Sequence, residues 1–256
     1  MADGLTGEVT LTGELISAFQ FSPTSQETLR KTAQIEIICT RRTEEFLDRL
    51  HDAEIVCSYW MPNNWRELAP KLRWLQCSGA GVDELLATGV LDSDSGVIVT
   101  TATGIHATTI SEYVFGSMLM FNRNWPEMVH LQERRIWPRS ASWYNLGGRE
   151  LVDQTLGIIG LGSIGRRVAQ LGRAFGMHVI ATRRTVNAEE HDPDVDQLYP
   201  MEQLHEVLSL SDYIVLAIPL TQETEKLIGE PELRKMRQHA YPVSYTHLRA
   251  HETGRN

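Results

Sequence analysis

The sequence predicts an α/β fold built from parallel sheets. Short runs rich in β-branched residues recur over residues 1–105, amphipathic helix-compatible stretches separate them, and the alternation resumes after about residue 155. Strands that alternate with helices in this way are typical of parallel sheets covered by helices.

The first five strands are expected where these apolar runs occur: Leu15–Phe21, Ile35–Thr40, Glu54–Trp60, Leu72–Ser78 and Gly96–Thr101. Four helices are expected between them, at residues 25–33, 43–51, 63–71 and 81–88. Each of these stretches begins with a capping-type residue or Gly and carries apolar residues at helical spacing. One compact domain is therefore expected over residues 1–105.

A longer helix is expected over residues 107–123, directly after His106. Apolar residues occupy nearly every face of this helix, so we expect it to be buried against another domain or subunit. Its Met and aromatic side chains are interpreted as core residues in preference to a cofactor site.

Composition limits the partners of this protein. The 256 residues carry a net charge of −9 and are 42% hydrophobic and 22% charged, as in a globular protein. The acidic balance argues against nucleic acid and anionic membranes, which bind clustered Lys and Arg. The start of the chain lacks a signal pattern and no run is long enough to span a membrane, so a cytoplasmic protein is expected.

The three cysteines, Cys39, Cys57 and Cys77, match no metal motif and are interpreted as buried thiols, so no metal is expected.

The most specific motif is G-x-G-x-x-G, within residues 155–184. Gly160 permits a tight turn, Gly162 lets the backbone approach a pyrophosphate, and Gly165 allows close packing of helix on strand. An apolar strand precedes the motif, and a helix and a second strand follow it, which is the context that dinucleotide binding requires. The predicted cofactor-binding residues are Gly160, Leu161, Gly162, Ser163, Ile164 and Gly165. The alternative is a strand-to-helix turn whose glycines serve geometry alone.

The end of the second strand indicates which dinucleotide is bound. Arg183 stands where an acid would bind the 2′-hydroxyl of NAD, and Arg184 follows it. Two guanidinium groups suit a 2′-phosphate, so NADP is preferred over NAD, unless both arginines are merely solvated surface charges. Further on, residues 201–212 are expected to form a helix and 213–219 a strand. Ile218 and Pro219, at the end of that strand, are expected to line the nicotinamide or ribose side.

Four blocks resemble the D-isomer-specific 2-hydroxyacid dehydrogenase family, in particular glyoxylate and hydroxypyruvate reductases. They are CSGAGVDELL, GIHATTISEYVFGSMLMFNR, LVDQTLGIIGLGSIGRRVAQLGRAFGMHVIATRR and SDYIVLAIPLTQETEKLIGEPELRKMR, spanning residues 70 to 237 approximately. The resemblance implies two Rossmann-like lobes with parallel sheets: a flavodoxin-like substrate lobe at 1–105 and an NAD(P)-binding Rossmann lobe at 106–240. It also implies a cleft between the lobes, a homodimer, and a loop that binds the substrate carboxylate. That loop consists of Ser78, Gly79, Ala80 and Gly81.

The family's reaction is hydride transfer between the nicotinamide and a 2-oxo or D-2-hydroxy acid. The resemblance implies that a catalytic Arg, acid and His follow a strand expected after residue 237. Residues 241–256 are polar and resemble a translated sequencing adaptor, so they are interpreted as a foreign, disordered tail, and His247 and His251 receive no role. We therefore assign no catalytic residue and expect an incomplete second lobe and an inactive chain. The alternatives are a non-catalytic dinucleotide-sensing or protein-binding module, and an NAD-linked phosphoglycerate-type or formate-type dehydrogenase.

Overall fold

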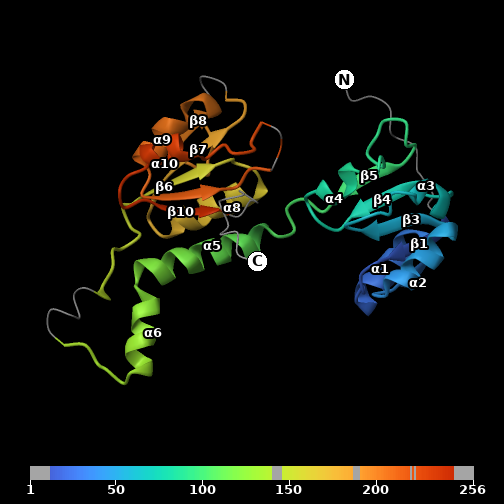
Figure 1. Ribbon diagram of the computed structural model, residues 1–256, viewed down its shortest axis with the longest axis horizontal. Coiled ribbons are helices and arrows are strands. Elements are labelled where there is room, and N and C mark those ends of the chain that lie inside the picture. Colours follow the sequence, from blue (N-terminus) through green and yellow to red (C-terminus); the bar gives the residue numbers. More distant parts are fainter. Residues whose placement is uncertain (1–11, 140–145, 187–190, 220, 222, 245–256) are drawn as a thin grey trace. The chain divides into compact units, whose positions relative to one another are not determined.

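The computed structural model describes residues 12–139, 146–186, 191–219, 221 and 223–244 (Figure 1). The chain divides into two compact units, Met1–Thr103 and Gly104–Asn256. Among the described residues, each unit contains one five-stranded sheet in which all neighbouring strands are parallel. The predicted α/β fold with two parallel sheets is confirmed, whereas the functional roles assigned to the two lobes stay predictions.

The first sheet has the strand order β2-β1-β3-β4-β5. Its strands are β1 (Thr12–Ser17), β2 (Gln34–Cys39), β3 (Ala53–Ser58), β4 (Trp74–Cys77) and β5 (Ile98–Thr101). Its helices are α1 (Pro23–Thr32), α2 (Thr43–Arg49), η1 (Leu50–Asp52), α3 (Trp65–Leu68) and α4 (Asp83–Leu86). The direction of winding reverses between β1 and β3, as in flavodoxin-like sheets.

Successive strand residues of the first unit alternate between two apolar clusters, as the pleat requires. Ile16 packs with Phe46 of α2 and with the buried residues of α3 and α4. Leu15 packs in a smaller cluster against Leu29 of α1. The two faces of the sheet are therefore covered by different helices.

The first strand lies earlier than predicted, at Thr12–Ser17 instead of Leu15–Phe21. The chain bends after Ser17, whose hydroxyl accepts a hydrogen bond from the Phe19 backbone N–H at 3.1 Å. Phe21 packs on the α1 side of the sheet, outside any strand. Because Phe21 is apolar, the sequence pattern predicts a strand up to this residue, although the backbone stops pairing with its neighbouring strands after Ser17.

The second sheet has the strand order β10-β9-β6-β7-β8. Its strands are β6 (Thr155–Ile159), β7 (His178–Arg183), β8 (Gln197–Pro200), β9 (Tyr213–Leu216) and β10 (Tyr241–Ser244). Its helices are α5 (Ala107–Asn122), α6 (Trp125–Glu133), α8 (Ser163–Ala174), η2 (Met201–Gln203), α9 (Leu204–Leu210) and α10 (Glu230–Lys235). Winding reverses between β6 and β9, the order of a Rossmann dinucleotide-binding sheet, and ligands bind at the carboxyl ends of strands at such a point.

The long helix α5 is buried along one stripe. Val114, Phe115 and Met118 pack with α8 and one face of the second sheet. Tyr113 and Phe121, in contrast, are 72% and 54% exposed. The expectation that another domain or subunit buries the rest of α5 stays a prediction.

The expectation that the disordered tail begins at residue 241 is wrong for Tyr241–Ser244. This segment, β10, pairs in parallel with β9, with Tyr241 opposite Tyr213. The Tyr241 ring lies 4.7 Å from the Phe121 ring, measured between centroids. Four residues that include a proline give a weak strand signal, but Pro is tolerated on an edge strand, and the neighbouring edge of β9 supplies the pairing. Residues 245–256, including His247 and His251, lie outside the described residues.

The edge strand β8 (Gln197–Pro200) is not among the strands expected from the sequence, because it lies in a mostly polar stretch. It pairs in parallel with β7, and Tyr199 is 4% exposed.

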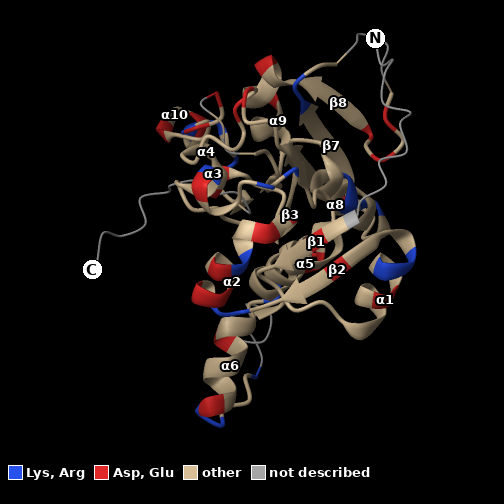
Figure 2. Cartoon of the chain, turned by 90° about the vertical axis from the view of Figure 1, so that its right-hand side faces the viewer, with Lys and Arg blue, Asp and Glu red and all other residues tan. Residues whose placement is uncertain are grey.

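The helices carry charged side chains on their surfaces. Figure 2 shows acidic positions along α2 and mixed charges along α1. Of the helices in the described ranges, none combines the length and the apolar character that crossing a bilayer requires.

Candidate functional site

The turn after β6 requires glycine at position 160. Gly160 has φ +97°, and a Cβ atom there would lie 2.5 Å from Ile218 Cγ2 and 2.9 Å from the Ala217 carbonyl oxygen. The Gly160 N–H donates to the Thr182 carbonyl and hydroxyl oxygens at 3.2 and 3.3 Å. Gly160 thus lies where the ends of β6, β7 and β9 meet, at the reversal in the second sheet.

The other two glycines of the motif have different surroundings. A Cβ on Gly165 would lie 2.2 Å from the Gly160 carbonyl oxygen, so Gly165 permits close packing of α8 on the turn. A Cβ on Gly162 would meet no atom within 4 Å among the described residues. Gly162 is the N-cap of α8, and no side-chain cap bond is formed there. The backbone at Gly162, where α8 begins, is therefore uncovered, and N–H groups and the helix dipole at such a position favour an anion.

The remaining motif residues divide by burial. Leu161 is 5% exposed and packs in the core between α5, α8 and the sheet, and Ile164 packs against the same cluster. Ser163 is exposed. The side chains of Leu161 and Ile164 therefore anchor the turn in the core, and its backbone N–H groups are the groups that can contact a ligand.

The two arginines lie at the carboxyl end of β7, beside the glycine turn. Thr182 is fully buried, Arg183 is half-buried and Arg184 is exposed. The Arg183 Nε donates to the Thr185 carbonyl oxygen at 2.9 Å. The strand end thus presents basic groups at the edge where α8 begins.

An ion-pair cluster that the sequence analysis missed lies near this edge. The Arg166 guanidinium of α8 donates to both carboxylate oxygens of Asp192, at 2.7 and 3.0 Å, and to Asp194 at 3.1 Å. Asp192 is 5% exposed. Its burial acts to raise its pKa, but the hydrogen bonds from Arg166 and the Asp194 N–H, with the charge of Arg183, hold that pKa below the usual value. The sequence feature that could have indicated this cluster is the spacing of Asp192, Asp194 and Asp196, with an aspartate at every second position.

The residues expected at the end of β9 are only partly suited to lining a ligand. Ile218 is 7% exposed and packs in the core on the α9 side, whereas Pro219 is exposed. The Thr224 hydroxyl donates to the Pro219 carbonyl oxygen at 2.6 Å, and the Thr221 N–H donates to Thr224 Oγ1 at 2.8 Å. These threonines close the turn after β9, which leaves Pro219 at the open edge.

The loop expected to bind the substrate carboxylate follows β4 in the first unit. The Ser78 N–H donates to the Ser58 carbonyl oxygen at 3.3 Å, and the Gly79 carbonyl oxygen accepts from the Ala102 N–H at 3.0 Å. Ala80 and Gly81 are exposed. The loop is therefore anchored at its start and open at its tip, at the carboxyl edge of the first sheet.

The three thiols show no sign of activation. Cys57 and Cys77 are buried and Cys39 is half-buried. Burial raises the pKa of Cys57. A raised pKa reduces the thiolate fraction of Cys57, which therefore behaves as a small apolar group.

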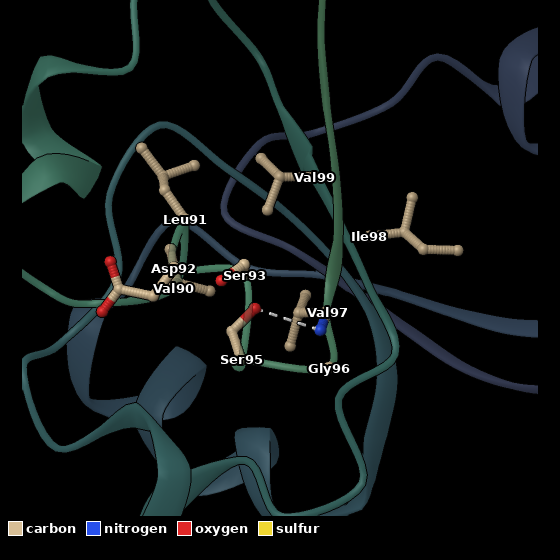
Figure 3. A pocket seen from close by; sticks show the side chains of 9 residues that line it. All are labelled: Val90, Leu91, Asp92, Ser93, Ser95, Gly96, Val97, Ile98 and Val99. Atoms are coloured by element: carbon tan, nitrogen blue, oxygen red, sulfur yellow. Dashed lines mark hydrogen bonds between the residues drawn. The ribbon is translucent and has the colours of Figure 1, made fainter.

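A separate pocket in the first unit has a volume of about 410 Å³ and is lined by residues 90–93 and 95–99 (Figure 3). Ser95 Oγ accepts a hydrogen bond from the Val97 N–H at 3.2 Å, marked by the dashed line. The lining comes from one continuous segment that leads into β5. It contains none of the predicted site residues.

Comparison with known proteins identifies a related family. A model described as D-isomer specific 2-hydroxyacid dehydrogenase, NAD binding domain, matches residues 115–246. A glyoxylate reductase of Aeropyrum pernix is 34% identical over 182 residues, which is 69% of this chain and 52% of the relative. A D-3-phosphoglycerate dehydrogenase of Methanocaldococcus jannaschii is 28% identical over 219 residues, covering 84% of this chain and 40% of the relative. This chain thus spans about half the length of the curated relatives it matches.

A solved structure has a similar fold. It is a D-lactate dehydrogenase of Aquifex aeolicus complexed with NAD and lactic acid, with a TM-score of 0.69 and 25% sequence identity. The match covers 90% of this chain and 68% of that one.

Proposed function

The chain belongs to the D-isomer specific 2-hydroxyacid dehydrogenase family, and from this premise we propose that its protein transfers hydride between a nicotinamide dinucleotide and C2 of a small 2-oxo or D-2-hydroxy acid. The observation that carries the proposal is the open space at Gly162, where α8 begins at the reversal of the second sheet. A pyrophosphate fits this space by charge and by the absence of a Cβ atom.

The cofactor supplies or accepts the hydride, and the protein's residues bind and orient. The backbone of residues 160–165 binds the pyrophosphate, and Pro219 lies on the nicotinamide or ribose side. The Ser78–Gly81 loop presents backbone N–H groups to the substrate carboxylate, as small residues allow. Glyoxylate and hydroxypyruvate are the proposed substrates, in keeping with the glyoxylate reductase relative.

The proposed cofactor preference is for NADP. Arg183 and Arg184 supply guanidinium groups where an NAD-specific site needs an acid. NAD is the alternative, since the D-lactate dehydrogenase neighbour is complexed with NAD.

Titration of tryptophan fluorescence with NADPH and NADH tests the proposed preference for NADP. Replacing Arg183 by Ala is expected to weaken NADPH binding about tenfold or more and to leave NADH binding within about twofold, since only NADPH carries the 2′-phosphate. Equal weakening of both would contradict the preference.

Catalysis by the 256 residues alone is not expected. We assign none of the described residues to the catalytic Arg, acid and His, so this chain is proposed to bind the cofactor without turnover. The assay is oxidation of NADPH with glyoxylate or hydroxypyruvate, and measurable turnover would contradict inactivity. If the whole protein binds cofactor but turns over no 2-oxo acid, the non-catalytic dinucleotide-sensing function is the one that remains.

A second copy of the chain is the proposed partner of α5 and α6. No described residue of α6 is buried, and Trp125 and Val129 are 51% and 49% exposed. Figure 1 shows α6 extending away from the second sheet. An exposed apolar surface of this kind is typical of subunit interfaces. Replacing Val129 by Asp is expected to convert a dimer to a monomer in analytical ultracentrifugation, with Glu127→Gln as the control. A wild-type protein that sediments as a monomer would exclude the dimer.

A further inference from the structure

The connection between β7 and β8 carries a ladder of acidic residues bound to α8. Asp192 binds Arg166, Asp194 binds Arg166 and Gln170, and Asp196 binds Arg173 at 2.9 Å. The helix residues are spaced i, i+4 and i+7 and share one face of α8. A turn at Pro193 and Asp194 lies between the first and last of the three carboxylates, and all three bind that face. We call residues 192–196 the acidic strap.

The two ends of the acidic strap have different surroundings. Asp196 directly precedes β8 and lies beside the start of β7, where its carboxylate also accepts the Val179 N–H at 2.7 Å. Asp192 lies at the opposite end, bound to Arg166, the residue directly after Gly165 of the glycine turn. The Asp192 end is therefore the one beside the candidate cofactor site.

Asp192 is also the more constrained of the two carboxylates. It is 5% exposed and receives two bonds from one guanidinium, and its Oδ1 also accepts the Asp194 N–H at 3.1 Å. Arg183 is the further charge that acts on it. The negative charge of Asp192 is thus held in place by Arg166 of α8, and Arg183 of β7 supplies a second positive charge that acts on it.

We propose that Asp192 is a specificity-determining residue for the dinucleotide, acting through Arg166 and Arg183. Its charge neutralises Arg166 and opposes Arg183, and so limits how strongly this edge of the sheet favours a cofactor that carries a 2′-phosphate. Asp192 is a positioning residue that need not touch the cofactor. The inference rests on the proposed function, because it presupposes that a nicotinamide dinucleotide binds at the glycine turn.

The sign of the effect follows from electrostatics. Removing the charge of Asp192 leaves Arg166 and Arg183 less compensated, which strengthens binding of the additional phosphate of NADPH more than binding of NADH. Removing the charge of Arg166 leaves Asp192 uncompensated and acts in the opposite direction. One unit charge near a partly exposed phosphate corresponds to about three- to tenfold in affinity at low salt.

The experiment measures dissociation constants of NADPH and NADH for the 256-residue chain by fluorescence titration at low salt. Asp192→Asn is expected to raise the preference for NADPH over NADH about three- to tenfold, and Arg166→Gln to lower it by a similar factor. Asp196→Asn is the matched control, because it removes a carboxylate from the other end of the same strap, and its preference is expected to stay within about twofold of the wild type. Thermal unfolding of each variant reports whether the fold is retained.

The outcomes separate the two proposals. A wild-type chain that binds neither dinucleotide overturns the proposed function. A wild-type chain that binds, with Asp192→Asn and Arg166→Gln each changing both affinities in parallel, overturns only the inference about Asp192, because a purely structural role would leave the preference unchanged. If one of these variants fails to fold, the other tests the inference by itself: a change of the NADPH preference in the expected direction supports it, and no change or the opposite change overturns it.

Discussion

At the scale of single residues, the three motif glycines are required for different reasons. Gly160 has a left-handed backbone and Gly165 has a carbonyl oxygen where its Cβ would be, whereas Gly162 is open. The first two are therefore requirements of the fold, and for the third we propose a requirement of the bound dinucleotide. Two matched substitutions separate these roles.

Replacing Gly165 by Ala is expected to destabilise the second unit by about 1–3 kcal/mol, since an added methyl group would overlap the Gly160 backbone. Denaturant unfolding measures this loss. Unchanged stability would mean that α8 shifts outward freely, which would contradict the close packing described here.

Replacing Gly162 by Ala is expected to leave the melting temperature within about 1–2 °C, because no described atom lies where the methyl group would be placed. Dinucleotide affinity is expected to fall about tenfold or more, because the backbone can no longer approach the pyrophosphate. Calorimetric titration measures the affinity. An alanine variant that binds as tightly as the wild type would exclude Gly162 from the site.

At the scale of elements, Asp212 joins three strands of the second sheet at their amino ends. Its carboxylate accepts the Thr155 N–H of β6 at 2.8 Å. It also lies 2.7 Å from Nη1 of Arg237 and 2.8 Å from Nε2 of His239, two residues that come just before β10. Its side chain is 9% exposed. Burial acts to raise the pKa of Asp212, but the Thr155, His239 and Arg237 hydrogen bonds outweigh it and lower that pKa below its usual value.

This lowered pKa predicts a pH dependence of stability. A carboxyl whose pKa is lower in the folded protein contributes stability that is fully present above its unfolded pKa of about 3.9. The contribution is lost as the pH falls through the folded pKa. Urea unfolding between pH 7 and pH 2.5 is expected to show this loss beginning near pH 4. Asp212→Asn is expected to be less stable at pH 7 and to have a shallower acid limb, and an unchanged acid limb would exclude Asp212 as its source.

At the scale of the whole molecule, the two units have separate hydrophobic clusters. The clusters around Phe46 and Leu15 belong to the first unit, and those around Val168 and Ile214 belong to the second. A unit with its own core is expected to unfold as a cooperative block of its own.

Scanning calorimetry is therefore expected to show two transitions. The dinucleotide is expected to raise the melting temperature of the second unit only. At a concentration of a hundred times its dissociation constant, it stabilises that unit by about 2.7 kcal/mol. A single transition would mean that the units unfold together. A shift of the first unit's transition alone would contradict the assignment of the cofactor site.

Local pattern was enough to predict most elements. The strand, glycine turn, helix and strand at residues 155–183 lie where the motif predicts them, since periodicity and turn chemistry act within a few residues. The strands β8 and β10 were missed, because four-residue edge strands carry little hydrophobic pattern of their own. Their pairing with β7 and β9 comes from residues distant in the sequence.

The sequence by itself determined the α/β class, the position of the glycine turn and the presence of basic residues at the end of β7. These depend on hydrophobic period and on the backbone freedom of glycine, which are local properties. Only the tertiary structure decided the strand order in each sheet, the contact between Gly160 and Ile218, and the pairing of Arg166 with Asp192. Those depend on which distant segments become neighbours when the apolar faces are buried, and a charge pair is fixed only once both backbones are in place.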